Sequence, residues 1–180
     1  MVSKTSLIRE GLSVLLNSKL NDDFLNKLKV VINDSTIESL DQIFGYKIET
    51  SRACEKYDNS IVAFVTFWEG IETLKFCFVF QNAFLQELLN QIYPEGSVTK
   101  DTFEELGKDT ACEIVNIICN KIKAFLNKNG FYSIMNLPYA EVQNAAVNSL
   151  SNDVAINANF SAGLSNESSN SVMYVNFSVE

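Results

Sequence analysis

The sequence contains no histidine. This absence excludes Ser–His and Cys–His nucleophile pairs, imidazole general bases and histidine-ligated zinc sites. The four cysteines, Cys54, Cys77, Cys112 and Cys119, include no C-x-x-C pair. Cys112 and Cys119 lie two turns apart on a predicted helix, roughly 10 Å by the helical rise, which is too far for a disulfide. We therefore interpret all four as reduced thiols, which predicts a cytoplasmic protein.

Basic residues and long apolar runs are also scarce. The formal net charge is −8 and the sequence pI is about 4.6. This balance argues against a nucleic-acid surface, which needs phosphate neutralisation, and against binding to an anionic membrane. The N-terminus has no sustained apolar run, so we expect neither a signal peptide nor a membrane span. With 47% hydrophobic residues, 7 Gly and 2 Pro among 180 residues, the chain predicts one packed domain with few long loops.

Apolar periodicity divides the chain into helical and alternating segments. Helices are predicted at residues 3–18, in a shorter segment opening at 21–23, and at 33–44, 81–93 and 106–127. Strands are predicted at residues 28–32, 47–57, 60–68, 71–80, 132–142, 152–161 and 171–179. Residues 60–80 and 152–179 each predict a hairpin, and Pro138 predicts a strand that is bent or at a sheet edge. The order predicts an α+β fold, with long helices packed on a mostly antiparallel β-sheet.

The most informative stretch is the predicted helix from Leu106 to Asn127, because its two faces differ in polarity. At about 100° per residue, apolar residues fall on one side and polar residues on the other. The apolar side holds Ala111, Val115, Ile118, Ile122 and Leu126, and the polar side holds Asp109, Glu113, Asn116, Asn120, Lys123 and Asn127. Glu113 and Asn116 are three residues apart and therefore surface neighbours, so both head groups can address one object. Such a polar stripe is usually only the solvated face of a helix.

A longer pattern gives this stripe a second interpretation. The string ACEIVNIICNKIKAFL, at residues 111–126, is followed after Gly130 by SIMNLPYAEV. Together they resemble the signature of the CheC/CheX chemotaxis phosphatases, in which a Glu-x-x-Asn motif on a long helix precedes a Gly and a strand entered through Pro. The matching positions here are Glu113, Asn116, Gly130 and Pro138. By order of elements the resemblance covers residues 28–180, which predicts a CheX-like domain there and an N-terminal helical extension at residues 1–27.

The resemblance implies hydrolysis of the aspartyl phosphate on a phosphorylated CheY-type response regulator. In this picture Asn116 orients the attacking water and Glu113 holds a lysine of the partner. Asp109, Ile117 and Asn120, which lie on or beside the same stripe, are predicted to contact the partner. The chain itself would need no metal or other cofactor, because Mg²⁺ would be carried by the receiver domain.

This chain departs from the family pattern at several places. Cys112 stands where a glycine often precedes the glutamate, and the N-terminal 27 residues have no recognised counterpart. The family usually carries Gly-Asn shortly after the motif, where this chain has Asn120-Lys121. Members of the CheC type carry a second Glu-x-x-Asn copy, where this chain has Glu38-Ser39-Leu40-Asp41. Because aspartate supplies no amide donor, we expect no second site at Asp41.

Other functions remain open on the sequence. The same fold could serve as a non-catalytic adaptor that binds a receiver or dimerises, and an unprotected sheet edge invites homodimerisation. A small-molecule sensor is a third alternative, which predicts a cavity at Phe64, Phe76 and Phe78. Loss of turnover with retained binding in an Asn116 variant distinguishes the phosphatase from the adaptor.

Overall fold

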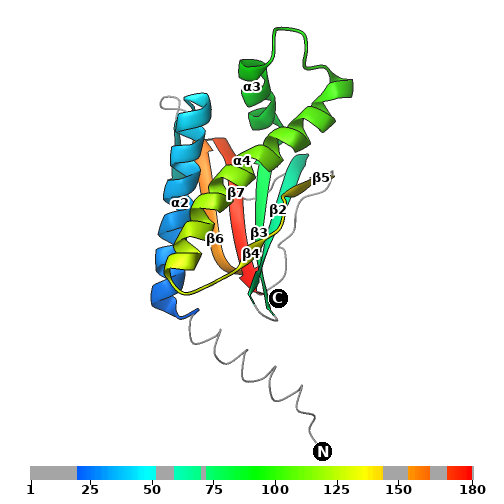
Figure 1. Ribbon diagram of the computed structural model, residues 1–180. Helices are drawn as coiled ribbons and strands as arrows, with labels where there is room; N and C mark the ends of the chain where they lie inside the picture. The colour runs from blue at the N-terminus through cyan, green and yellow to red at the C-terminus, as the bar shows by residue number, and fades with distance from the viewer. Residues whose placement is uncertain (1–19, 52–58, 70–71, 144–153, 163–169, 180) are drawn as a thin grey trace, which may run out of the picture.

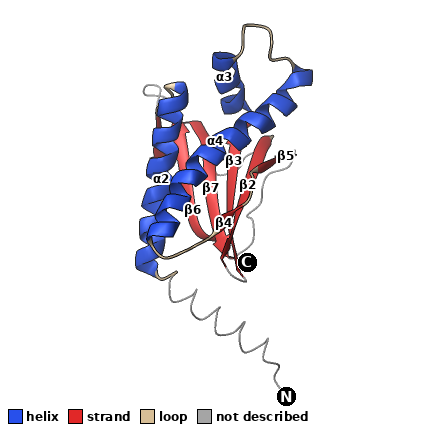
Figure 2. Cartoon of the chain, viewed as in Figure 1, coloured by secondary structure: helices blue, strands red, loops and turns tan. Residues whose placement is uncertain are grey.

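The computed structural model describes residues 20–51, 59–69, 72–143, 154–162 and 170–179, and the structural statements below concern these residues. Seven strands form one antiparallel sheet, and two helices, α2 (Asp22–Phe44) and α4 (Lys100–Lys128), cover one face of it (Figure 1). A third helix, α3 (Asn82–Ile92), stands at one end of the sheet beside α4 (Figure 2). The predicted α+β fold, with long helices on an antiparallel sheet, is confirmed.

The strands are β1 (Ile48–Ser51), β2 (Ser60–Glu69), β3 (Glu72–Gln81), β4 (Ile134–Met135), β5 (Tyr139–Gln143), β6 (Val154–Ala162) and β7 (Asn170–Val179). Their order across the sheet is β1-β6-β7-β3-β2, and both β4 and β5 pair with the outer side of β2. The predicted hairpins β2–β3 and β6–β7 are confirmed as antiparallel pairs. The predicted strand at residues 132–142 is divided at Pro138, which has no N–H for a ladder, into two edge strands. The predicted strand at 47–57 is described only as far as Ser51.

Helix α2 corrects the prediction of a strand at residues 28–32 followed by a separate helix at residues 33–44. The chain is one helix from Asp22 to Phe44. Asn21 caps its start, because its side chain accepts a hydrogen bond of 2.9 Å from the backbone N–H of Phe24. A stripe of residues buried at helical spacing, Leu28, Ile32, Thr36 and Leu40, packs inward and overrides the local strand preference.

The start of α2 also bears on the predicted domain boundary. The division between residues 27 and 28 falls inside α2, and Phe24 lies in the core. The first helix of the domain therefore begins before the predicted start at residue 28. The helix predicted at residues 3–18 lies outside the described residues, so a separate N-terminal extension stays a prediction.

The core lies between the sheet and the two long helices. Phe24 of α2 packs against Phe125 and Phe131, with ring centroids 5.5 and 4.9 Å apart. Phe76 and Phe78 of β3 are fully buried in this core, whereas Phe64 belongs to a separate cluster on the opposite face of the sheet. The three phenylalanines therefore do not line a common cavity, which contradicts the small-molecule sensor alternative. No helix in the described ranges is long and apolar enough to span a bilayer.

The position of α4 on the sheet is set at its start and where it crosses β2. Thr99 and Thr102 form a reciprocal capping box at its start. Gly107 faces the sheet, and a Cβ atom there would lie 2.6 Å from Cδ1 of Ile61. Glycine thus allows the helix to approach β2 closely, with its opposite face turned away from the sheet.

Tyr46 links the end of α2 to α3 and makes the stability of the fold depend on pH. Its hydroxyl donates to Oε2 of Glu87 at 2.6 Å, and its ring packs edge-on against Phe84. Burial, and then the hydrogen bond and charge of Glu87, raise the pKa of Tyr46 to about 12 from a usual value of 10.0. The protonated phenol therefore stabilises the fold fully below pH 10, and this contribution is lost as the pH rises through 12.

We expect the free energy of unfolding of the wild type to fall more steeply between pH 10 and 12 than that of Tyr46→Phe. The phenylalanine variant keeps the ring but has no group to titrate. Urea unfolding followed by circular dichroism at several pH values in this window measures the difference. Parallel curves for the two proteins would contradict the assigned role of the phenol.

Candidate functional site on α4

The outer face of α4 carries the predicted polar stripe. All five residues of the predicted apolar side, Ala111, Val115, Ile118, Ile122 and Leu126, are fully buried. On the opposite side Glu113 is exposed and Asn116 is half-buried. The sequence therefore predicted correctly which face of this helix packs on the sheet and which faces outward.

The two motif side chains have no partner within the described part of the chain. The Glu113 carboxylate forms no ion pair there, and the Asn116 carboxamide forms no hydrogen bond. The backbone carbonyl of Asn116 accepts a hydrogen bond of 2.9 Å from Nδ2 of Asn120, one turn further along. Glu113 thus offers a free anion, and Asn116 offers both a free donor and a free acceptor.

The three predicted partner contacts differ in their surroundings. Asp109 is exposed one turn before Glu113, and Ile117 is half-buried beside the stripe. Asn120 is exposed, but its amide nitrogen is used within the helix. Their contact with a partner stays a prediction.

A contact between helices joins Lys121 to the segment where members of the CheC type carry a second motif copy. Nζ of Lys121 lies 3.2 Å from Oε2 of Glu38 on α2. Ser39 and Leu40 next to Glu38 are buried. Such exposed ion pairs contribute at most about 1 kcal/mol. The pair therefore adds little to the stability of the contact between α2 and α4.

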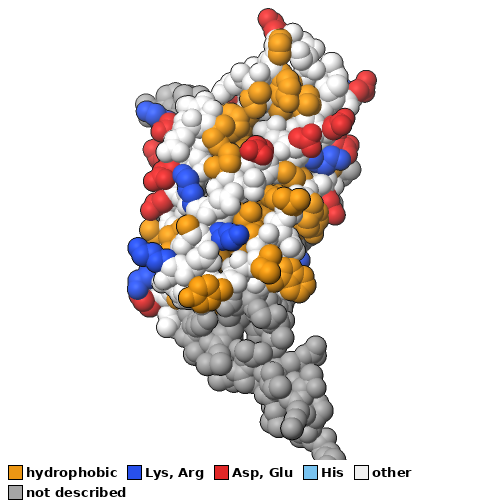
Figure 3. Space-filling model, in the orientation of Figure 1, with side chains coloured by type: hydrophobic (Ala, Val, Ile, Leu, Met, Phe, Trp, Pro, Cys, Tyr) orange, Lys and Arg blue, Asp and Glu red, His pale blue; other side chains and the backbone are white. Residues whose placement is uncertain are grey.

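An apolar hollow of about 250 Å³ borders the stripe, and the sequence did not reveal it. It lies where α2 and α3 end against α4, and its lining consists of Ile43, Phe44, Ile92, Thr110, Glu113, Ile114 and Ile117. Ile43 is 43% exposed, and Ile92 is 49% exposed. Figure 3 shows apolar side chains gathered on this face between the ends of α2 and α3. In the sequence, the hollow is indicated only by the positions of Ile43 and Ile92 at the ends of their helices.

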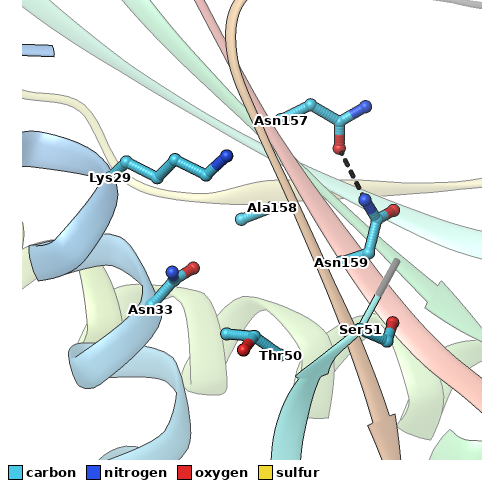
Figure 4. A pocket seen from close by; sticks show the side chains of 7 residues that line it. All are labelled: Lys29, Asn33, Thr50, Ser51, Asn157, Ala158 and Asn159. Atoms are coloured by element: carbon cyan, nitrogen blue, oxygen red, sulfur yellow. Dashed lines mark hydrogen bonds between the residues drawn. The ribbon is translucent and has the colours of Figure 1, made fainter. Parts of the chain in front are cut away.

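A second, polar hollow of about 360 Å³ lies away from α4. Lys29 and Asn33 of α2, Thr50 and Ser51 of β1, and Asn157, Ala158 and Asn159 of β6 line it (Figure 4). Nδ2 of Asn159 donates to Oδ1 of Asn157 at 3.2 Å, whereas Oδ1 of Asn33 and Oγ of Ser51 are buried without a partner. Water can satisfy such polar groups in a hollow of this size. None of these residues belongs to the stripe of α4.

The fold, unlike the sequence, has clear relatives. No protein-family model matches the sequence, and no curated protein matches it significantly. The chemotaxis protein CheX from Vibrio vulnificus superposes with a TM-score of 0.66 at 13% identity, over 85% of this chain and 96% of that one. The fold is that of CheX. The predicted resemblance is thereby confirmed at the level of the fold.

Two further structures show the range of proteins with the CheX fold. A chain of the CheX–CheY–BeF₃–Mg²⁺ complex from Borrelia burgdorferi matches with a TM-score of 0.60 at 11% identity, over 83% of this chain and 95% of that one. FliY from Thermotoga maritima matches with a TM-score of 0.59 at 15% identity, over 88% and 91% of the two chains. Proteins of different names thus share the CheX fold, and the roles of individual residues have to be argued from the site.

Burial makes the described cysteines poor nucleophiles. Burial raises the pKa of the Cys119 thiol, and it raises that of Cys77 to about 12. Cys112, next to Glu113, also has a raised pKa, because of burial and then the charge of Asp109. None of these thiols readily forms the nucleophilic thiolate. Within the described ranges no group of three His, Cys, Asp or Glu residues could hold a metal ion.

Proposed function

We propose that this chain is a CheX-like phosphatase that hydrolyses the aspartyl phosphate of a phosphorylated CheY-type receiver domain in chemotaxis signalling. The observation that carries the proposal is the pair of unpartnered side chains, Glu113 and Asn116, on the outer face of α4 in a CheX fold. The CheX–CheY–BeF₃–Mg²⁺ complex supports the choice of partner, since BeF₃⁻ has the shape and charge of a phosphoryl group. The cytoplasmic location predicted from the thiols is kept as part of this proposal.

Asn116 would act on the attacking water. Its carboxamide oxygen accepts a hydrogen bond from the water and its amide nitrogen donates one, so it can hold the oxygen in line with phosphorus. The water oxygen then bonds to phosphorus, the bond from phosphorus to the aspartyl oxygen breaks, and inorganic phosphate leaves. Phosphoryl transfer needs positioning and charge neutralisation more than covalent chemistry. Mg²⁺, held by the receiver, would supply much of that neutralisation.

Glu113 would set the depth at which α4 enters the receiver. Its free carboxylate can pair with a lysine of the receiver about one turn from Asn116. Asn120 and Lys121, which depart from the family pattern, do not bind the side chains of Glu113 or Asn116. Asn120 donates to the backbone carbonyl of Asn116, and Lys121 pairs with Glu38. The motif therefore stays available to a partner.

Replacing the docking carboxylate provides the first test. We expect Glu113→Ala to raise the KM for a phosphorylated receiver about tenfold, equivalent to about 1.4 kcal/mol, with kcat near the wild-type value. Steady-state phosphate release with Mg²⁺ measures both constants. Glu49→Ala is the matched control, because Glu49 is an exposed carboxylate on β1, away from α4. Equal KM values for Glu113→Ala and Glu49→Ala would contradict the docking role.

A non-catalytic adaptor is the second candidate, since proteins of different names share this fold and the fold alone does not fix an activity. As an adaptor the chain would bind a receiver, or a second copy of itself through a sheet edge, without hydrolysis. Binding of a receiver with no acceleration of its dephosphorylation would favour this candidate.

A further inference from the structure

We infer that the apolar hollow beside Glu113 is the docking pocket for one bulky apolar side chain of the receiver domain, carried next to the basic side chain that meets Glu113. This inference rests on the proposed function, since it names how the same partner is held. Only Thr110 and Glu113 bring polar side chains to this pocket.

The shape of the pocket follows from where three helices end or cross. Gly45, at φ 63°, stops α2 directly after Phe44, and α3 stops at Ile92 before Pro94. Their last isoleucines, Ile43 and Ile92, therefore remain about half exposed and form two walls. Ile114, which is 1% exposed, belongs to the core and forms the floor.

The volume of the pocket limits which side chains can bind in it. An apolar cavity of about 150 Å³ accepts a benzene-sized group, and this hollow has about 250 Å³. It therefore has room for one aromatic or long aliphatic side chain, together with part of the backbone that carries it. A polar side chain would lose its hydration against Ile114 and Phe44 without gaining partners.

The charge of α4 beside the pocket favours a partner surface of opposite charge. From Asp101 to Glu113, α4 carries five carboxylates and one lysine, Lys108, which pairs with Glu104 at 2.9 Å. From Ile114 to its end the helix carries three lysines and no acid. The pocket adjoins the acidic half, so a complementary surface is apolar at its centre and basic at its rim.

The pocket and the motif form one continuous surface. The residues that α4 contributes to the pocket, Thr110, Glu113, Ile114 and Ile117, follow the spacing of a single ridge along a helix. Glu113 belongs both to this ridge and to the motif with Asn116. A partner that reaches Glu113 with a cation therefore places an apolar side chain in the pocket within about one helical turn, 5.4 Å. This arrangement gives Ile117 its predicted role in partner binding.

Binding of a beryllofluoride-loaded CheY-type receiver with Mg²⁺, measured by calorimetry with the receivers of the same genome, tests the inference. We expect Ile43→Ser and Ile92→Ser each to raise the Kd about tenfold, because each removes an apolar wall at the centre of the interface. The kcat at saturating phosphorylated receiver stays near the wild-type value. Val30→Ser is the matched control, since Val30 is 56% exposed on α2 and does not line the pocket.

The outcomes separate this inference from the proposed function. If Ile43→Ser and Ile92→Ser bind as tightly as the wild type and Val30→Ser, the pocket is overturned even when dephosphorylation is confirmed. If both variants weaken binding but the wild type does not accelerate dephosphorylation, the docking pocket stands and the phosphatase is overturned. Ile92→Val, which keeps most of the apolar wall, is expected to restore near wild-type affinity. Weak binding by Ile92→Val equal to that of Ile92→Ser would also contradict the inference.

Discussion

Replacement of Asn116 by alanine is expected to lower the kcat for receiver dephosphorylation by about 100-fold or more, equivalent to about 2.7 kcal/mol of barrier. The variant loses the group that orients the attacking water but keeps Glu113 and the apolar pocket. The Kd for a beryllofluoride-loaded receiver should therefore change little. Asn116 is half-buried on an outward face and its side chain makes no hydrogen bond within the described residues, so its loss should not unfold the protein.

Asn127→Ala is the matched control for this effect. Asn127 is an exposed asparagine on the polar side of the same helix, three turns beyond the motif. Its loss should leave both kcat and Kd near the wild-type values. If Asn116→Ala keeps the wild-type kcat, the proposed positioning of water is wrong.

Truncation of Phe131 is expected to lower the free energy of unfolding by about 3–5 kcal/mol. Phe131 follows the end of α4, is 1% exposed, and packs its ring 4.9 Å from that of Phe24 at the start of α2. Alanine there would leave a cavity where the two long helices meet. Because the two helices form the layer that presents the motif, receiver binding should weaken at temperatures where the variant begins to unfold.

Tyr132→Ala is a control from the next position in the chain. Tyr132 is 83% exposed, so its truncation should change stability by no more than about 0.5 kcal/mol. Urea unfolding monitored by circular dichroism gives both values. Similar destabilisation by Phe131→Ala and Tyr132→Ala would mean that the described packing at the end of α4 is wrong.

The two long helices differ in how far the sequence predicted them. In α4 the apolar and polar stripes persist over many turns, so periodicity gave both the helix and its buried face. In α2 the run Val30-Val31-Ile32 and the following Asn33-Asp34-Ser35 imitate a strand and a helix cap. Burial at helical spacing on both sides of this run kept the helix continuous, and such tertiary packing is not visible in a short window of sequence.

The candidate site was predictable only in part for a similar reason. The position of Glu113 and Asn116 on an outward face follows from the period of one helix. The apolar pocket joins α2, α3 and α4, and the ion pair between Lys121 and Glu38 joins residues 83 positions apart. Local patterns do not contain such contacts. The pocket and the ion pair form only in the folded chain, where α2, α3 and α4 meet.

The most direct test is the decay of a phosphorylated CheY-type receiver with Mg²⁺, at a molar amount of this protein well below that of the receiver. It tests whether Asn116 catalyses dephosphorylation of a receiver that Glu113 docks. We expect the wild type to accelerate the decay until all receiver is dephosphorylated, so that each molecule acts many times. The double variant Glu113→Ala/Asn116→Ala should leave the decay at the rate of the receiver alone. If the wild type binds the receivers but leaves their decay unchanged, catalysis is contradicted and the chain is an adaptor with the CheX fold.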